Sequence, residues 1–178
     1  MLCAMYQNKS FDKQADNIVN GTIVVLAFPG AEILDIAGPL DILCMAPCYQ
    51  DKGIDTRRRH KSLIVSEFGE PITTYPSGIT IQTEPLNAIG NRQIDTLIIP
   101  GGYNMEQAIS NPTIIKWIQD MASRARRVVS ICTGAFLLGE AGLLRGRRVT
   151  THWRFVDELA RRYPEVVVEP DSIFTTDG

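Results

Sequence analysis

The sequence has few of the residues that build metal sites, membrane spans or nucleic-acid surfaces. Its 178 residues include only 4 Cys and 2 His, and the cysteines lack the paired spacing near histidine that zinc sites use. No apolar run approaches the roughly 20 residues that cross a membrane. A formal net charge of −2 leaves no basic excess for a nucleic-acid surface. We therefore expect no metal ion, no membrane association and no DNA-binding surface on this chain itself.

We also expect neither a leader peptide nor the glycine-rich loops of nucleotide-binding proteins. Residues 1–20 are polar and contain no long apolar segment, unlike a secretory signal. Neither a GxGxxG pattern nor a Walker motif follows a predicted strand. We expect a cytoplasmic protein without a cofactor, in which residues 1–20 form a polar, peripheral extension and residues 21–178 form one domain.

Apolar strands alternate with helical segments through the rest of the chain. Strands are predicted at 22–28, 61–68, 95–99, 128–131, 147–150, 166–168 and 173–175, and helices at 38–45, 112–127, 133–142 and 153–163. Residues 72–74 and 78–82 suggest a small antiparallel excursion, and a polar connector follows up to residue 93. This alternation predicts an α/β fold with a mostly parallel central sheet.

Cys132 stands where a predicted strand turns into a predicted helix. Residues 128–131 are apolar and largely β-branched, and a small-residue helix pattern begins at Thr133. Ser130 and Gly134 provide the small neighbours that a nucleophile elbow requires, with Cys in place of Ser. Such a turn points the thiol at a helix N-terminus, which predicts a lowered thiol pKa. The alternative is a buried cysteine that merely packs at a strand end.

Two further strand ends carry candidate site residues. Asp35 lies beyond strand 22–28 and next to a helix start, and the carboxyl ends of parallel strands form the ligand-binding edge of an open sheet. A helix N-cap is the alternative role for Asp35. Gly101 and Gly102 follow strand 95–99, where glycine amides can approach a ligand or an oxyanion closely. Pro-Gly-Gly is also a common turn, so this signal is weak by itself.

Four ordered motifs resemble the PfpI/ThiJ superfamily, which has the class I glutamine amidotransferase-like fold. They are FPGAEILDIAGP at 28–39, IIPGG at 98–102, SICTG at 130–134 and GLLRGRRVTTHW at 142–153. The resemblance covers residues 22–178. It implies a flavodoxin-like, three-layer sandwich whose final strand and helix are absent from this sequence.

Within the superfamily the sequence is similar to two branches, the isonitrile hydratases and the N-terminal sensor-like domain of AraC/XylS-type transcriptional regulators. The segment ELARRYPEVVVEPDSIF at 158–174 resembles the regulators closely. That resemblance implies a homodimer that binds a small-molecule ligand. It also implies that DNA is contacted only through an appended domain with two helix-turn-helix units, which this sequence does not contain.

The resemblance also implies one site with two sets of residues, catalytic Cys132, Asp35 and Thr133 and ligand-binding Gly101, Gly102, Thr133 and His152. Cys132 would supply a thiolate, and Asp35 would donate or shuttle a proton. The amides of Gly102 and Thr133 would hold an oxyanion or a carboxylate. Thr133 stands where other branches carry histidine, so the obvious general base of Cys-His hydrolysis is missing. For His152, the alternative is that it caps a strand end or forms a hydrogen bond in the core.

Three functions are therefore open. The first is the ligand-sensing domain of an AraC-family regulator, which we favour over an enzyme. The second is an isonitrile hydratase-like lyase in which Cys132 attacks an electrophilic carbon and Asp35 handles protons. The third is a redox sensor in which an exposed, low-pKa Cys132 is oxidised to a sulfinic acid stabilised by Asp35.

Overall fold

A six-stranded sheet forms the centre of the protein. The computed structural model describes residues 2–7, 21–46, 49–50, 53–54 and 60–177. The strand order is β1-β10-β9-β2-β5-β8, with β1 at Leu2–Gln7, β2 at Thr22–Leu26, β5 at Lys61–Ser66, β8 at Glu84–Pro85, β9 at Ile94–Ile99 and β10 at Ala125–Ile131. All neighbours pair in parallel except β1, which runs antiparallel to β10. The predicted α/β fold with a mostly parallel sheet is confirmed.

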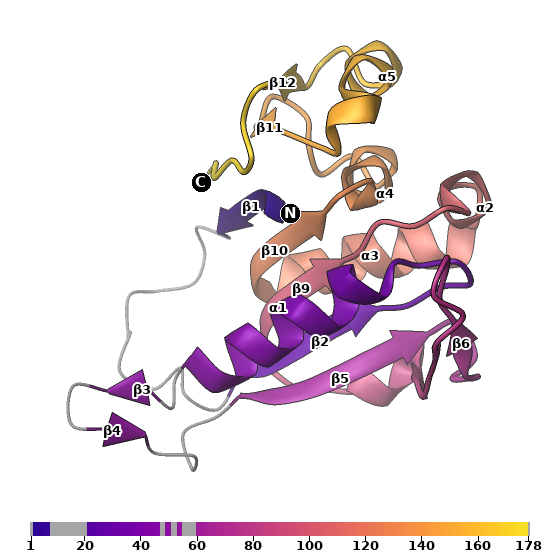
Figure 1. The fold of residues 1–178 in the computed structure, drawn as a ribbon, viewed down its shortest axis with the longest axis vertical. Coiled ribbons are helices and arrows are strands. Elements are labelled where there is room, and N and C mark those ends of the chain that lie inside the picture. The colour runs from indigo at the N-terminus through magenta and orange to yellow at the C-terminus, as the bar shows by residue number, and fades with distance from the viewer. Residues whose placement is uncertain (1, 8–20, 47–48, 51–52, 55–59, 178) are drawn as a thin grey trace.

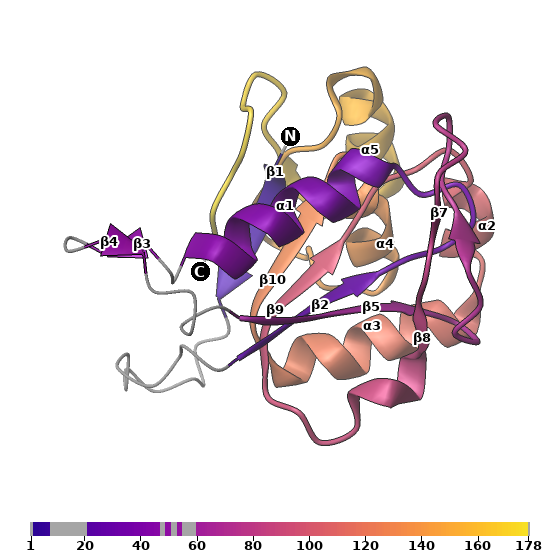
Figure 2. The ribbon, with the colours of Figure 1, turned by 60° about the horizontal axis from the view of Figure 1, so that its bottom comes forward.

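Helices cover both faces of this sheet (Figures 1 and 2). The helical elements are α1 at Ile33–Met45, α2 at Met105–Ile109, α3 at Pro112–Arg124, α4 at Gly134–Glu140 and α5 at Val156–Arg162, with 3₁₀ turns η4 at Leu86–Ile89 and η5 at Trp153–Phe155. Figure 2 shows α1 on one side of the sheet and α3 on the other. Because both faces are covered, every residue of β2 and β9 is buried, as central parallel strands require.

Helix α3 illustrates how local signals and packing agree. The Asn111 side chain caps it by accepting hydrogen bonds from the N–H groups of Thr113 (2.9 Å) and Ile114 (3.3 Å), and Pro112 occupies the first turn, where a missing N–H costs little. The buried face comprises Ile114, Trp117, Ile118, Met121 and Ala122. The predicted helix therefore exists, although it ends at Arg124 and β10 begins at the next residue.

The remaining strands form small two-stranded sheets. These strands are β3 at Tyr49–Gln50, β4 at Gly53–Ile54, β6 at Ile72–Thr73, β7 at Thr80–Ile81, β11 at Arg148–Val149 and β12 at Val167–Val168. The antiparallel β6–β7 pair matches the predicted excursion, and β11 pairs in parallel with β12. No helix in the described part of the chain is long and apolar enough to cross a membrane.

Several predicted boundaries are wrong. Leu2–Gln7 is not a peripheral extension but an edge strand, β1, paired with β10; the rest of the predicted extension, 8–20, lies outside the described residues. The predicted connector contains β8 and η4, and residues 173–175 form no strand. Strand pairing joins segments far apart in sequence, which local patterns do not reveal.

Helix α1 also begins earlier than the sequence predicts. Pro39 lies inside α1 rather than at its start, so Asp35 belongs to the first helical turn. Asp35, Ile36 and Leu40 are the buried side chains of the helix, and they share one face at helical spacing. Packing of this face on the sheet outweighs the local helix-breaking tendency of proline.

Candidate functional site

The loops that follow β2, β9 and β10 meet at the carboxyl edge of the sheet (Figure 1). Ala31 and Gly102 form an isolated antiparallel bridge. The Glu32 N–H donates to the Gly101 carbonyl at 3.0 Å, and the Tyr103 N–H donates to the Gly30 carbonyl at 3.0 Å. These backbone bonds fix the start of α1 against the Pro-Gly-Gly loop.

Cys132 occupies a tight turn between β10 and α4. Its φ of +54° is the one positive φ among the described non-glycine residues, a conformation that side chains other than glycine seldom adopt. The Thr151 hydroxyl donates to the Cys132 carbonyl at 2.9 Å. A Cβ at Gly134 would collide with the Ile99 carbonyl, so only glycine lets α4 start this close to the end of β9. The predicted strand–turn–helix around Cys132 is present.

Asp35 points from α1 toward the Pro-Gly-Gly loop. Its Oδ2 accepts a hydrogen bond from the Gly101 N–H at 3.0 Å, and the residue is 6% exposed. Burial raises the pKa of the Asp35 carboxyl to about 6, and the Gly101 hydrogen bond opposes this rise only in part. The alternative of a helix cap is wrong, because the carboxylate bonds across the site rather than to its own helix.

Cys132 and Asp35 share this small region. A Cβ at Gly101 would lie 2.9 Å from the Cys132 Cβ and 2.7 Å from the Thr133 nitrogen, so the glycine that binds Asp35 also packs against the cysteine turn. Burial and the negative charge of Asp35 raise the pKa of the Cys132 thiol, while hydrogen bonds from Thr133 lower it. The predicted lowering of this pKa is therefore wrong, since desolvation dominates.

Thr133 and the amides of Gly101 and Gly102 form hydrogen bonds with one another or with Asp35, within the site. The Gly102 N–H donates to the Thr133 Oγ1 at 3.1 Å, and the Thr133 hydroxyl is 3.4 Å from the Gly102 carbonyl, to which it donates. The Gly101 N–H is committed to Asp35. The sequence predicted that the Gly102 amide would bind an anion, whereas in this structure it binds the threonine hydroxyl.

A cavity of about 910 Å³ opens above these residues. Of the predicted residues, Asp35, Gly102, Cys132, Thr133 and His152 line it; Gly101 does not. The other lining residues are Glu32, Leu34, Tyr103, Asn104, Met105, Glu106, Gln107, Ile109, Phe136, Trp153, Arg154, Phe155 and Glu158. These come from α1, α2, α4, η5 and α5 and from the residues just before α1 and α2. The structure thus brings the predicted site residues together in one cavity, and Gly101 supports it from behind.

His152 both lines the cavity and caps η5. Its Nδ1 accepts a hydrogen bond from the Arg154 N–H at 3.2 Å, so a neutral ring carries its proton on Nε2. The ring stacks on Trp153, with 5.4 Å between centroids. The alternative predicted for His152, a strand-end cap or a core hydrogen bond, is replaced by a cap of the 3₁₀ turn η5, and the residue also lines the cavity.

Sequence reasoning did not identify the aromatic wall of the cavity, which Tyr103, Trp153 and Phe155 form. Tyr103 and Trp153 are 65% and 74% exposed, and Phe155 lies next to His152, with ring centroids 5.7 Å apart. Tyr103 directly follows the Pro-Gly-Gly turn, and Trp153 ends a motif quoted for the superfamily. Their positions beside strand ends were the available signal.

Among the described residues, no group of three His, Cys, Asp or Glu side chains could hold a metal ion.

Comparison with curated proteins identifies several relatives. An uncharacterized protein in the cpoL 5′ region of Streptomyces lividans is 39% identical over 142 residues, 80% of this chain and 94% of that protein. The isonitrile hydratase of Pseudomonas putida is 32% identical over 158 residues, 86% of this chain and 63% of that enzyme. The HTH-type transcriptional regulator CdhR of Pseudomonas aeruginosa is 27% identical over 157 residues, 86% of this chain. The chain spans 43% of that regulator, so it covers less than two thirds of either functionally named relative.

Solved structures share the fold. Drosophila melanogaster DJ-1beta superposes with a TM-score of 0.72 at 18% identity, covering 89% of this chain and 78% of that one. A putative transcriptional regulator from Vibrio parahaemolyticus superposes with a TM-score of 0.70 at 22% identity, covering 89% and 81%. The model of the DJ-1/PfpI family matches residues 21–178. The chain belongs to the DJ-1/PfpI family.

Proposed function

We propose that this chain is the ligand-sensing domain of an AraC-type transcriptional regulator. The observation that carries the proposal is the cavity of about 910 Å³ around Cys132 and Asp35, a volume within the usual range for small-molecule sites. In this proposal a small metabolite binds in the cavity of a cytoplasmic homodimer. DNA is contacted by a separate domain of the whole regulator.

The chemistry of the cavity supports binding over turnover. The raised pKa of the Cys132 thiol leaves little thiolate at neutral pH. Thr133 follows the cysteine and offers no general base. Of the two amides expected to hold an oxyanion, those of Gly102 and Thr133, the Gly102 N–H is already engaged by the Thr133 hydroxyl. These features suit a pocket that holds a ligand rather than one that activates a nucleophile.

Relatives named as regulators support the same proposal. CdhR is similar along 86% of this chain, and the part of it without a counterpart here could hold the DNA-binding helices. A 51-residue stretch is also 53% identical to the HTH-type transcriptional regulator Rv1931c of Mycobacterium tuberculosis. By analogy, ligand binding at the cavity would change how such helices are presented to DNA.

Ligand binding can be tested with a metabolite library and a thermal-shift readout. We expect at least one small molecule to raise the melting temperature by several degrees, since a ligand at 100 times its Kd adds about 2.7 kcal/mol. The rise should shrink in Trp153→Ala and persist in Asp120→Asn, whose exposed carboxylate lies on α3. A library without any binder would contradict a sensing role.

An isonitrile hydratase-like activity is the second candidate. It is favoured by the Asp35 carboxyl, whose pKa of about 6 allows proton exchange near neutral pH. The Cys132 thiol would add across the isonitrile carbon, forming a C–S bond with its proton moved to the substrate. Water would then displace the sulfur, releasing an N-substituted formamide and the thiol. We expect no substantial formamide production; robust production abolished by Cys132→Ala would favour the enzyme.

A redox-sensing role fits the site less well. It depends on a low-pKa thiol, whereas burial and Asp35 raise the pKa of Cys132. A sulfinate beside Asp35 would also place a second negative charge next to a buried carboxylate. Preferential oxidation of Cys132 over Cys3, Cys44 and Cys48 under mild peroxide, measured by mass spectrometry, would reverse this assessment.

A further inference from the structure

We propose that the cavity takes an organic cation that carries N–H groups on an apolar body: a primary ammonium, amidinium or guanidinium compound. The nitrogen would bind Asp35, and the body would lie against the aromatic wall formed by Tyr103, Trp153 and Phe155. This inference rests on the proposed ligand-sensing function and names the ligand class of the same site.

The first argument is an unused hydrogen-bond acceptor on Asp35. Its Oδ2 accepts from Gly101, and no described residue donates a hydrogen bond to its Oδ1. Asp35 is 6% exposed and lines the cavity, and its Oδ1 is not among the fully enclosed polar atoms that lack a partner, so a ligand in the cavity can reach this oxygen. A carboxylate in such a desolvated site gains from each further donor. A ligand N–H would supply the missing hydrogen bond, and its positive charge would offset the burial of the carboxylate.

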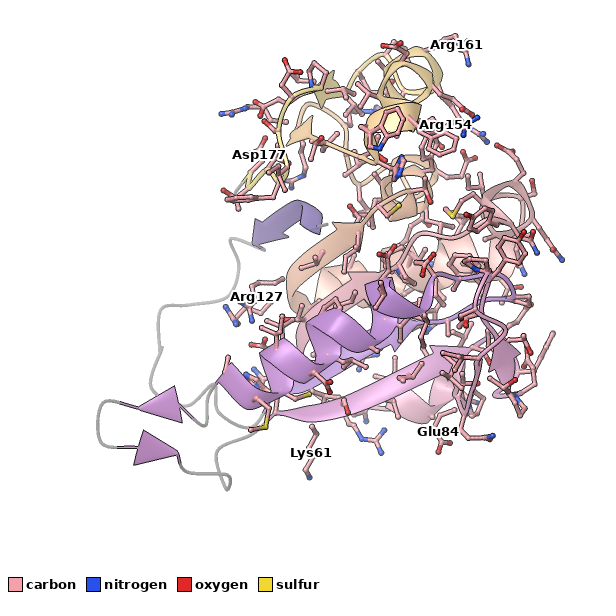
Figure 3. All side chains as sticks on the ribbon, in the orientation of Figure 1. Lys61, Glu84, Arg127, Arg154, Arg161 and Asp177 are labelled. Atoms are coloured by element: carbon pink, nitrogen blue, oxygen red, sulfur yellow. The ribbon has the colours of Figure 1, made fainter. Side chains whose placement is uncertain are left out.

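The second argument is the balance of charge around the cavity. The carboxylates on its lining are Glu32, Asp35, Glu106 and Glu158, and among the described residues Arg154 is its lone lysine or arginine. Arg162 outside the lining binds Glu106 at 2.6 Å and so offsets one further charge. Figure 3 shows Arg154 at the η5 end of the molecule, far from Arg127 and Lys61. A net negative lining favours cations and disfavours anions.

The third argument is the aromatic wall. Tyr103 and Trp153 line the cavity and are 65% and 74% exposed, although large aromatic residues normally gain stability by burial. Tyr103 is braced edge-on by Tyr75, with 4.3 Å between centroids, and Trp153 is braced by His152. Rings held in place with open faces beside carboxylates are suited to cation–π contact.

A series of probes on one aromatic skeleton separates charge from shape. We would titrate the protein with 2-phenylethylamine, its N,N,N-trimethyl derivative, 2-phenylethanol and 3-phenylpropanoate by isothermal titration calorimetry at neutral pH. The primary amine should bind at least about tenfold tighter than the alcohol, the trimethyl compound should lie between them, and the propanoate should bind weakest. The trimethyl compound keeps the charge but cannot donate to Asp35, so it isolates the cation–π contribution.

Two variants and a matched control assign the contacts. Asp35→Asn keeps an acceptor for Gly101 but removes the charge, so the affinity for the amine should fall about tenfold or more, with a smaller loss for the trimethyl compound. Trp153→Leu should weaken both cations and leave the alcohol little changed. Asp41→Asn removes the same charge from an exposed position of α1 and should leave all affinities unchanged.

The outcomes separate this inference from the sensing proposal. Tighter binding of the alcohol or the propanoate than of the amine overturns the inference, as does an amine affinity unchanged in Asp35→Asn. The absence of saturable binding by every probe up to about 10 mM also overturns it. The sensing proposal is decided separately by the metabolite screen, where a neutral or anionic ligand would support sensing and refute the cation.

Discussion

Asp35 and Asp95 are both buried carboxylates, but they lie at opposite edges of the same sheet. Asp95, at the amino edge, receives hydrogen bonds from Arg126 (2.6 and 2.8 Å), Arg127 (2.8 Å) and the Thr96 hydroxyl (2.7 Å). Burial would raise its pKa, but these hydrogen bonds and charges outweigh burial and lower it. Asp35, with one backbone donor, has its pKa raised to about 6.

The difference separates a carboxylate compensated by two arginines from the carboxylate at which we propose that a ligand binds. Arg126 and Arg127 come from the first residues of β10, and they join that strand to β9 through Asp95. At the other end of β10, Cys132 lies in the same region as Asp35, whose burial is offset only in part by the hydrogen bond from Gly101. Proteins tolerate uncompensated groups chiefly where function uses them, which supports the proposed site at the carboxyl edge of the sheet.

Removing the Asp95 charge should have the largest effect. Asp95→Asn leaves two arginines without their shared partner, and we expect a loss of about 3–4 kcal/mol in the free energy of unfolding, measured by urea denaturation at pH 7. Because the folded-state pKa of Asp95 is lowered, its stabilisation is present above its ordinary pKa of 3.8 and is lost as pH falls through the folded-state value. The variant should lack that acid-dependent loss.

The control for Asp95 is Asp120→Asn. Asp120 pairs with Lys116 at 2.6 Å, but both side chains are more than half exposed, so its loss should cost under about 0.5 kcal/mol. Equal effects of the two substitutions would show that the buried cluster at the amino edge contributes no more than a surface pair.

The corresponding change at Asp35 should have the opposite sign. Its folded-state pKa is raised from 3.8 to about 6, so its favourable contribution is present below pH 3.8 and is lost as pH rises to about 6. Above pH 6 the buried charge is a penalty, and Asp35→Asn should stabilise the protein by up to about 3 kcal/mol. The gain over wild type should shrink between pH 6 and pH 4. An Asp35→Asn protein less stable than wild type at pH 8, with Asp41→Asn neutral, would refute this sign.

Asp35, unlike the exposed Asp41 of α1, should also affect the reactivity of the Cys132 thiol. Asp35 raises the pKa of Cys132, so Asp35→Asn should speed alkylation of Cys132 by iodoacetamide at pH 7.5 by about 3- to 10-fold. The rate is followed by mass spectrometry on the peptide that contains Cys132. The exposed-site variant Asp41→Asn should leave the rate unchanged, and an unchanged rate in Asp35→Asn would show that the carboxylate does not act on the thiol.

The smallest predicted effect concerns Ser130, between the two edges on β10. Its hydroxyl is buried and has no hydrogen-bond partner among the described residues, so Ser130→Ala should be neutral or stabilising by about 0.5–1 kcal/mol. Thr151 provides the matched comparison, because its buried hydroxyl does donate, to the Cys132 carbonyl. Thr151→Val should cost about 1 kcal/mol in the same denaturation assay.

Much of the fold could be predicted because its signals are local. The strands around 22–28 and 95–99, the turn at Cys132 and helix α3 carry their own apolar patterns and breaker residues. Asp35, Gly101, Gly102 and Cys132 followed from the rule that parallel strands end at one edge, whereas Thr133 and His152 came from the resemblance to the PfpI/ThiJ superfamily. The edge strand β1 and the early start of α1 were missed, because both depend on pairing and packing with distant segments.

The electrostatics of the site could not be predicted from the sequence. The pKa of Cys132 depends on how deeply the turn is buried and how near Asp35 comes, and neither is encoded in the residues around position 132. The engagement of Gly101 by Asp35 joins positions 66 residues apart. The aromatic wall likewise depends on α2 and η5 folding over the edge, and α2 has only five residues, too few for a periodic pattern.

Trp153 gives the protein a built-in optical reporter. The sequence has only 2 tryptophans, and the other, Trp117, is buried beside η4, where its indole N–H donates to the Leu86 carbonyl at 3.3 Å. Trp153 lies mostly in solvent at the cavity. Occupancy of the cavity can therefore be followed as a change in emission from Trp153 over a constant signal from Trp117, without attaching a dye.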